Sequence, residues 1–175
     1  MLPRLCKIAL VGSVAFYLLL VVANNLSDYG SNFAFVAHVL AMDTIFEASD
    51  TRWRALESPL AHHTFYAVII LWEMIAMVWC AIGAWRLWSR RRADAAEFNR
   101  SKATAVGGLT CSLLQWFVAF LTIGGEWFLM WQSRIWNGQD AAFRMFAIVG
   151  LILLFVAQED RDPPAVAAAR RPSES

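Results

Sequence analysis

The chain has little charge, few cysteines and no familiar catalytic motif. Charged residues make up 17% of its 175 residues, and the formal net charge is +1, so no overall field attracts nucleic acid or an acidic substrate. The three cysteines, Cys6, Cys80 and Cys111, form no CxxC pair and no Cys/His metal spacing. A Walker loop, a GxSxG elbow and an HExxH motif are also missing from the sequence. We therefore predict no nucleic-acid partner, no metal, no other cofactor and no enzymatic activity.

The chain is unusually rich in long runs of hydrophobic residues. Hydrophobic residues make up 59% of it, the mean hydropathy is +0.48, and the apolar residues fall into four blocks at about 5–23, 61–86, 103–131 and 141–157. Each block is long enough to cross most or all of the ~30 Å of hydrocarbon at ~1.5 Å per residue. We therefore expect an all-α integral membrane four-helix bundle, with residues 1–157 as one domain. The polar, Pro- and Ala-rich residues 158–175 are expected to form a disordered cytoplasmic tail.

The basic residues predict the orientation of the bundle in the bilayer. Eleven Lys and Arg residues lie on one side of the four blocks and four on the other. The side richer in basic residues faces the cytoplasm, so both termini are expected there. The first block also fits a secretory signal, whose cleavage would leave three spans, but we favour an uncleaved span.

The first outside loop is expected to contain a short extra helix. Phe33–Met42 has no proline or glycine, and Ser31 and Asn32 precede it as candidate caps. A helix of this length reaches only ~15 Å, so it must lie on the outer surface or over the mouth of the bundle. Ser58 and Pro59 then predict the start of the second span, as an N-cap followed by proline at the first helical position.

Polar groups inside the apolar blocks are the first candidates for function, because each is costly in hydrocarbon unless it is paired. Glu73, Gln115 and Tyr17 lie at similar depth in three different blocks, and we expect them to form one hydrogen-bonded cluster. Two interpretations stay open. A neutral Glu73 joins the helices structurally, or Glu73 relays protons or binds a ligand.

Glu126 and Arg144 are the second candidate group. They lie at matching depth near the outside face, on the third and fourth blocks, which are antiparallel and joined by a short turn. An ion pair would satisfy both charges. The alternative is that Arg144 reaches the headgroups while Glu126 faces water.

The histidines raise the question of haem or metal binding. His62 and His63 are adjacent, so on a helix they point about 100° apart and cannot hold one ion together. His38 also lies at the outside edge. Surface or hydrogen-bonding roles are therefore favoured over ligation.

Two long stretches of sequence resemble a known family. Asn24–Asp43 and Gly124–Gly138 are similar to the conserved blocks of a bacterial family of predicted small integral membrane proteins of unknown function, and the likeness extends over about residues 3–156. The resemblance implies a small four-span bacterial membrane protein and transfers no catalytic residue. We expect this protein in the inner membrane. Both stretches face outside in the predicted topology, which suggests one shared outside surface. Its candidate residues are Asn24, Asp28, Asn32, His38, Asp43, Trp127, Trp131 and Asn137.

These features favour an accessory subunit that binds a membrane-protein partner through its outside surface. A small transporter or proton-coupled carrier that uses Glu73 is the first alternative, and a quinone- or haem-associated redox protein is the second. A transporter requires a polar cavity that reaches the middle of the membrane. A redox protein is coloured when purified, and an accessory subunit co-purifies with its partner.

Overall fold

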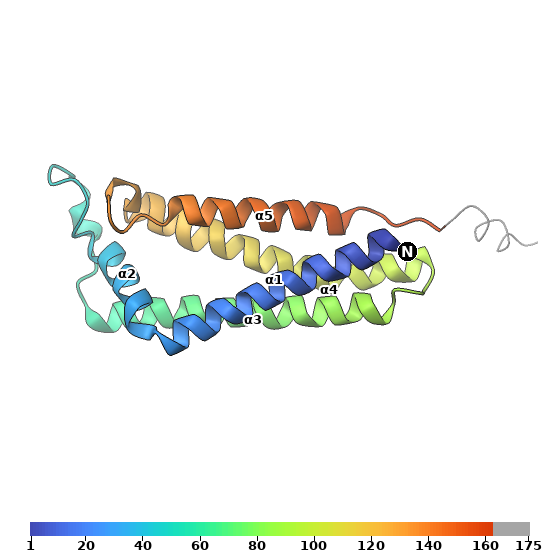
Figure 1. Ribbon diagram of the computed structural model, residues 1–175. Coiled ribbons are helices and arrows are strands. Elements are labelled where there is room, and N and C mark those ends of the chain that lie inside the picture. The colour runs from blue at the N-terminus through green and yellow to red at the C-terminus, as the bar shows by residue number, and fades with distance from the viewer. Residues whose placement is uncertain (163–175) are drawn as a thin grey trace, which may run out of the picture.

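The computed structural model describes residues 1–162, which form a bundle of helices. Four helices are long and apolar enough to cross a membrane, and each is antiparallel to the next along the chain (Figure 1). They are α1 (Leu2–Ser27), α3 (Pro59–Ser89), α4 (Ala95–Leu114) with its π-helical continuation η2 (Gln115–Trp127), and α5 (Gln139–Ala157). The shorter elements are the helix α2 (Tyr29–Ala41) and the 3-10 turns η1 (Arg52–Arg54) and η3 (Met130–Gln132). The predicted four-helix bundle with a short extra helix is confirmed.

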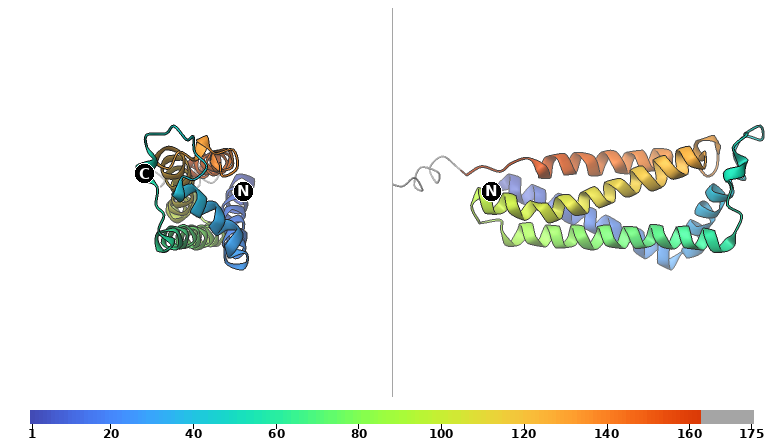
Figure 2. Two further views of the ribbon diagram at one scale, coloured as in Figure 1. Left: turned by 90° about the vertical axis from the view of Figure 1, so that its left-hand side faces the viewer. Right: turned by 180° about the vertical axis from the view of Figure 1, so that it is seen from behind.

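The two ends of the bundle carry different elements. α1 begins and α5 finishes at the same end, which we call the terminal end (Figure 1). The helix α2 and the turns η1 and η3 gather at the opposite end, which we call the loop end. Seen from that end, α2 lies across the mouth of the bundle (Figure 2).

α1 continues to Ser27, past residue 23, where the first apolar block ends. Asn24 and Asn25 are helical, and α2 follows α1 after the single residue Asp28. The predicted caps Ser31 and Asn32 lie inside α2, where Ser31 Oγ donates to the Asp28 carboxylate at 3.0 Å. The turn propensity of the two asparagines is overridden by a tertiary contact, because Asn25 is buried and hydrogen-bonded to another helix.

Two apolar cores hold the helices together. The larger core contains buried side chains from all four long helices, among them Val11, Leu18, Ala76, Leu109 and Val149. A smaller core at the loop end joins α2 to α3 and to the segment after η2, through residues that include Val36, Leu40, Tyr66, Phe128 and Met130. Removal of this apolar surface from water or headgroups holds α2 in place, although it is too short to span the bilayer.

α3 is the central helix and packs most extensively against α4 and α1. It begins as predicted, with Pro59 in the first turn and Ser58 Oγ accepting from the Ala61 backbone N–H at 3.5 Å. Gly108 of α4 sets the approach of these two helices, because a Cβ there would lie 2.7 Å from the backbone nitrogen of Cys80. The absence of a side chain at this glycine therefore brings the two backbones into contact.

The third membrane-length helix differs from its predicted limits at both ends. It begins earlier, at Ala95, because the Asp94 carboxylate caps its first turn. From Gln115 to Trp127 the helix winds with π geometry. It ends before Trp131 because Leu129 adopts a left-handed backbone conformation with φ 53°.

Candidate functional site

A buried carboxyl group joins three of the long helices. Glu73 of α3 is only 2% exposed and points into the bundle. Its Oε2 accepts a hydrogen bond from Asn25 Nδ2 of α1 at 2.6 Å, and its Oε1 accepts one from Gln115 Nε2 at the start of η2 at 3.2 Å. Both carboxyl oxygens are thus satisfied by amide groups of neighbouring helices, as a buried polar group requires.

The structure brings together two of the three residues predicted for this cluster. Glu73 and Gln115 are in contact, whereas Tyr17 packs against the main core and makes no hydrogen bond to Glu73 in the described part of the chain. Asn25, about two turns further along α1, takes that place. Sequence reasoning missed Asn25 because asparagine usually indicates a turn. Tyr66 extends the network by donating from its hydroxyl to the Asn25 carbonyl at 3.2 Å.

The polar network lies at the transition from α4 to the π-helix. Three buried side-chain atoms there have no hydrogen-bond partner within residues 1–162, namely Ser112 Oγ, Gln115 Oε1 and Trp116 Nε1. A side chain of α3 also binds the backbone of α4 here, since Trp72 Nε1 donates to the Cys111 carbonyl at 3.1 Å. At this height, the interior of the bundle therefore contains buried polar groups, and some of them lack a hydrogen-bond partner among the described residues.

Glu126 and Arg144 do not form the predicted ion pair. Both side chains are exposed, and neither takes part in a salt bridge among the described residues. Matching depth determines the height of a side chain along the bundle but not its direction around the helix axis. The π-helix has more residues per turn than an α-helix, so Glu126 points in a different direction from the one that α-helical geometry predicts.

The two stretches that carry the family resemblance meet at the loop end. The Trp136 ring stacks on His38 with ring centroids 4.6 Å apart and meets Phe35 edge-on at 6.3 Å. Thr44 Oγ1 donates to Ser133 Oγ at 2.8 Å. We call this unit, formed by residues 29–46 and 129–138, the loop-end cap. It is an ordered surface built from segments that are far apart in the sequence.

The residues predicted for an outside surface are all at or near the loop end. His38 is partly buried, and its Nδ1 lies 2.5 Å from Oδ2 of Asp43. Asn137 is bonded locally, through its Oδ1 to the Gln139 backbone N–H at 3.0 Å. The candidates with exposed side chains are Asn24, Asp28, Asn32, Asp43, Trp127, Trp131 and Asn137.

Each of the three histidines has its own hydrogen-bond partner. His62 Nε2 lies 2.6 Å from the Leu56 carbonyl, and His63 Nδ1 lies 2.8 Å from the Tyr29 hydroxyl. In the part of the chain that the structure describes, no three His, Cys, Asp or Glu residues are grouped so that they could hold a metal ion. The contacts of His62 and His63 agree with the hydrogen-bonding role that the sequence favours.

The terminal end contains an ion cluster that sequence reasoning missed. Oδ2 of Asp160 lies 2.6 Å from Lys7 Nζ of α1 and 2.5 Å from Lys102 Nζ of α4. The side chain of Asp160 is 9% exposed, that of Lys7 3% and that of Lys102 6%, so the three charges are largely removed from solvent. Arg4 makes longer contacts, at 3.9 Å to Asp160 and 3.7 Å to Asp162. We call these five residues the terminal clasp.

The clasp holds the segment that follows α5. Burial by itself would raise the pKa of Asp160, but the hydrogen bonds and charges of the two lysines outweigh it and hold that pKa below its ordinary value. Asn99 Nδ2 also donates to the Asp160 carbonyl at 2.9 Å. The prediction of a disordered tail is therefore wrong for Gln158–Asp162. Asp160 and Asp162 of this segment pair with basic residues that, from the sequence, only flank the membrane spans. The remainder of the tail, residues 163–175, lies outside the described residues.

Four antiparallel apolar helices around a buried polar network define a small multi-pass integral membrane protein. The model of one protein family, described as predicted small integral membrane protein (DUF2165), matches residues 3–159. Since the match covers most of the chain, the protein belongs to this family, as its two long sequence stretches suggest. Searches of curated proteins and of solved structures found no match to the chain.

Proposed function

We propose that this protein is a non-enzymatic accessory subunit of the bacterial inner membrane that binds a membrane-protein partner through its loop-end cap. The observation that supports the proposal is large apolar side chains exposed on an ordered part of the chain. Ile135 is 74% exposed and Phe46 is 55% exposed, and Trp131 lies edge-on to Phe46. Exposed apolar groups of this size on an ordered surface are typical of protein interaction sites.

Site-specific photo-crosslinking in native membranes tests this surface. A photoreactive amino acid replaces Phe46 or Ile135, and the matched control replaces Leu154, which is 67% exposed on the membrane-spanning helix α5. We expect a discrete protein adduct from the two cap positions, which mass spectrometry then identifies after solubilisation in mild detergent. Adducts at Phe46 and Ile135 that do not differ from those at Leu154 would contradict the proposal.

The orientation of the bundle is part of the proposal. The asymmetry of basic residues in the sequence, eleven against four, supports an orientation in which both termini lie in the cytoplasm. Single cysteines at Asn137 and Ser89, in a variant without the native cysteines, test this with a membrane-impermeant maleimide added to intact spheroplasts. We expect the label only at Asn137, and labelling of Ser89 would show the opposite orientation.

A proton-coupled carrier that uses Glu73 is the second candidate function. It is supported by two buried polar atoms near the start of the π-helix, Gln115 Oε1 and Ser112 Oγ, which have no hydrogen-bond partner within residues 1–162. Vesicles of reconstituted protein with a pH-sensitive dye inside test the candidate. Proton flux that is lost in Glu73→Gln and kept in Glu126→Gln, an exposed carboxyl control, would favour it over the accessory role. No flux under any imposed gradient would argue against it.

A further inference from the structure

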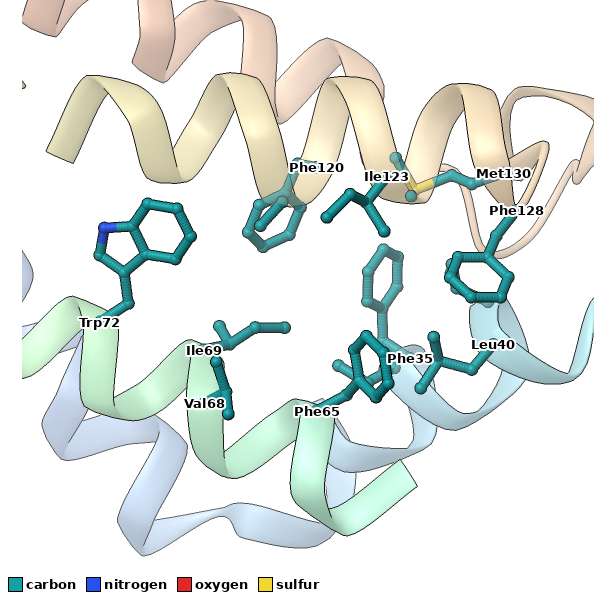
Figure 3. A pocket seen from close by; sticks show the side chains of 14 residues that line it. Phe35, Leu40, Phe65, Val68, Ile69, Trp72, Phe120, Ile123, Phe128 and Met130 are labelled. Atoms are coloured by element: carbon teal, nitrogen blue, oxygen red, sulfur yellow. The ribbon is translucent and has the colours of Figure 1, made fainter. Parts of the chain in front are cut away.

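An apolar groove lies between α3 and η2 in the loop-end half of the bundle. Its volume is about 140 Å³, and side chains from α2, α3 and η2 project into it from both sides (Figure 3). Its lining residues are apolar or glycine, with Phe35 and Phe128 towards the loop end and Trp72 at the far end. From Phe65 to Trp72 it extends roughly 10 Å along α3. The groove therefore has the shape and the polarity of a site for a hydrocarbon chain.

The groove is open on the side of the bundle. Val68 is 53% exposed, Phe65 38% and Ile123 37%, although all three line the groove. They belong to helices that are long and apolar enough to span a membrane, so their exposed surfaces face the hydrocarbon of the bilayer. A polar solute does not enter from hydrocarbon without a large desolvation cost. The groove is therefore accessible to lipid chains.

A wider depression continues the groove to the loop end. Its volume is about 490 Å³, and its rim carries Trp53, Arg54 and Trp127. It shares three lining residues with the groove: Phe65, Ile123 and Phe128. Tryptophan is enriched at the level of the lipid headgroups, so the depression connects the headgroup level with the hydrocarbon.

Arg54 is a fixed cation with unused donors at this level. Its guanidinium lies 4.7 Å from the ring centroid of Trp127 and 5.5 Å from that of Trp53. Its Nη1 donates one long hydrogen bond, 3.4 Å, to the Trp127 carbonyl, while its buried Nε has no hydrogen-bond partner within residues 1–162. Arg54 also takes part in no ion pair of that part of the chain. A planar guanidinium with free N–H groups is well suited to bind a phosphate.

We propose that one anionic glycerophospholipid of the adjoining leaflet occupies this site, with its phosphate on Arg54 and one acyl chain in the groove. A cavity of roughly 150 Å³ holds a molecule the size of benzene, so the groove takes about six carbons of the chain, between Ile69 and Phe120. The part of the chain nearer the headgroup lies in the depression past Phe65. The guanidinium charge of Arg54 binds the headgroup, and the shape of the groove accommodates the acyl chain. The inference is independent of the proposed accessory role.

Photolabelling with lipids tests the site. The protein is reconstituted in phosphatidylcholine vesicles doped with a phosphatidylglycerol that carries a diazirine in its acyl chain, and the labelled peptides are mapped by mass spectrometry after irradiation. We expect the label to concentrate in residues 65–72 and 119–124 rather than on the exposed face of α5 around Leu151. The same diazirine chain on phosphatidylcholine should label these two segments less.

Paired variants separate the headgroup from the chain. Arg54→Gln should lower the phosphatidylglycerol adduct in the groove roughly tenfold, because a charge-assisted contact is lost. Arg52→Gln removes the same charge from an exposed side chain of the same turn and should leave the adduct unchanged. Ala119→Leu fills the groove and should lower the adducts of both lipids, whereas Ala81→Leu, on an exposed face of α3, should not.

Folding of each variant is checked by circular dichroism and gel filtration. Should Arg54→Gln fail to fold, Arg54→Lys should fold and keep the preference for phosphatidylglycerol, and Ala119→Leu still tests the chain site. Uniform labelling around the bundle would overturn the proposal. So would groove labelling that is equal for the two lipids, or labelling that excess soluble glycerol phosphate abolishes, since that would show a headgroup site that needs no chain.

Discussion

Lys7 in α1 and Asp160 after α5 lie at opposite ends of the chain, yet Lys7 Nζ is 2.6 Å from Asp160 Oδ2. Lys102 of α4 shares the same carboxylate oxygen at 2.5 Å. Three separate parts of the bundle are therefore joined by one buried carboxylate. Chain ends usually fray unless they are tied down, and the terminal clasp ties both ends of the described chain.

Neutralising the carboxylate should destabilise the protein. Asp160→Asn leaves the Lys7 and Lys102 ammonium groups buried without their counter-charge, so we expect the free energy of unfolding to fall by about 3 kcal/mol. Glu159→Gln is the matched control, because Glu159 is exposed and adjacent in the chain, and it should cost less than about 0.5 kcal/mol. Unfolding in dodecyl maltoside micelles with increasing sodium dodecyl sulfate, followed by circular dichroism, measures both. Equal effects of the two substitutions would contradict the clasp.

The stability that Asp160 contributes should depend on pH in the acid range. Its pKa is lower in the folded protein than the value of about 3.9 for an unfolded chain. The unfolded state therefore binds the proton first as the pH falls, so the contribution is complete above this value and is lost below it. The difference in unfolding free energy between wild type and Asp160→Asn should be constant from neutral pH to about pH 5 and should shrink towards pH 3. A difference that stays constant at acid pH would argue against this account.

The contact between Glu73 and Asn25 should be energetically coupled. Glu73→Ala leaves the buried amide groups of Asn25 and Gln115 without acceptors, which should lower the free energy of unfolding by about 2 kcal/mol or more. Glu126→Ala, at an exposed glutamate, should have little effect. A double-mutant cycle of Glu73→Ala with Asn25→Ala should give a coupling energy of about 1 kcal/mol or more. Additive effects would show that the hydrogen bond does not contribute to stability.

The close approach of α3 and α4 should be sensitive to one methyl group. Gly108→Ala would place its Cβ 2.7 Å from the Cys80 backbone nitrogen, so we expect a loss of about 1–3 kcal/mol through overpacking. Gly12→Ala is the control, because no atom lies within 4 Å of a Cβ built at that glycine of α1. That substitution should be neutral or slightly stabilising. The same micelle unfolding assay compares them, and a neutral Gly108→Ala would contradict the observed packing.

The loop-end cap should open when its central ring is removed. Trp136→Ala deletes the ring that stacks on His38 and contacts Phe35, so α2 should lose much of its support from the cap. We expect faster amide hydrogen exchange in Tyr29–Ala41, measured by mass spectrometry. Trp131→Ala removes a more exposed ring of the same type and should change the exchange of α2 much less. Unchanged exchange in Trp136→Ala would show that α2 is ordered without the cap.

The limits of the prediction are clearest at the polar residues. Glu73 and Gln115 could be placed in one cluster because their depth follows from the apolar runs that contain them. Asn25 was missed because its local signal is that of a turn, and the signal that could have found it was a polar residue at the end of an apolar run. Glu126 and Arg144 were paired wrongly because depth was known and direction around the axis was not.

The sequence by itself determined that four helices span the membrane, that a shorter one follows the first, and that α3 begins at Ser58 and Pro59. These features are local, because apolar length and cap residues act within a few turns of one helix. The tertiary structure alone decided that Glu73 meets Asn25 and that Asp160 meets two lysines from distant helices. Such pairings depend on the rotation and the register of each helix, and these are set by the packing of many side chains along the whole interface.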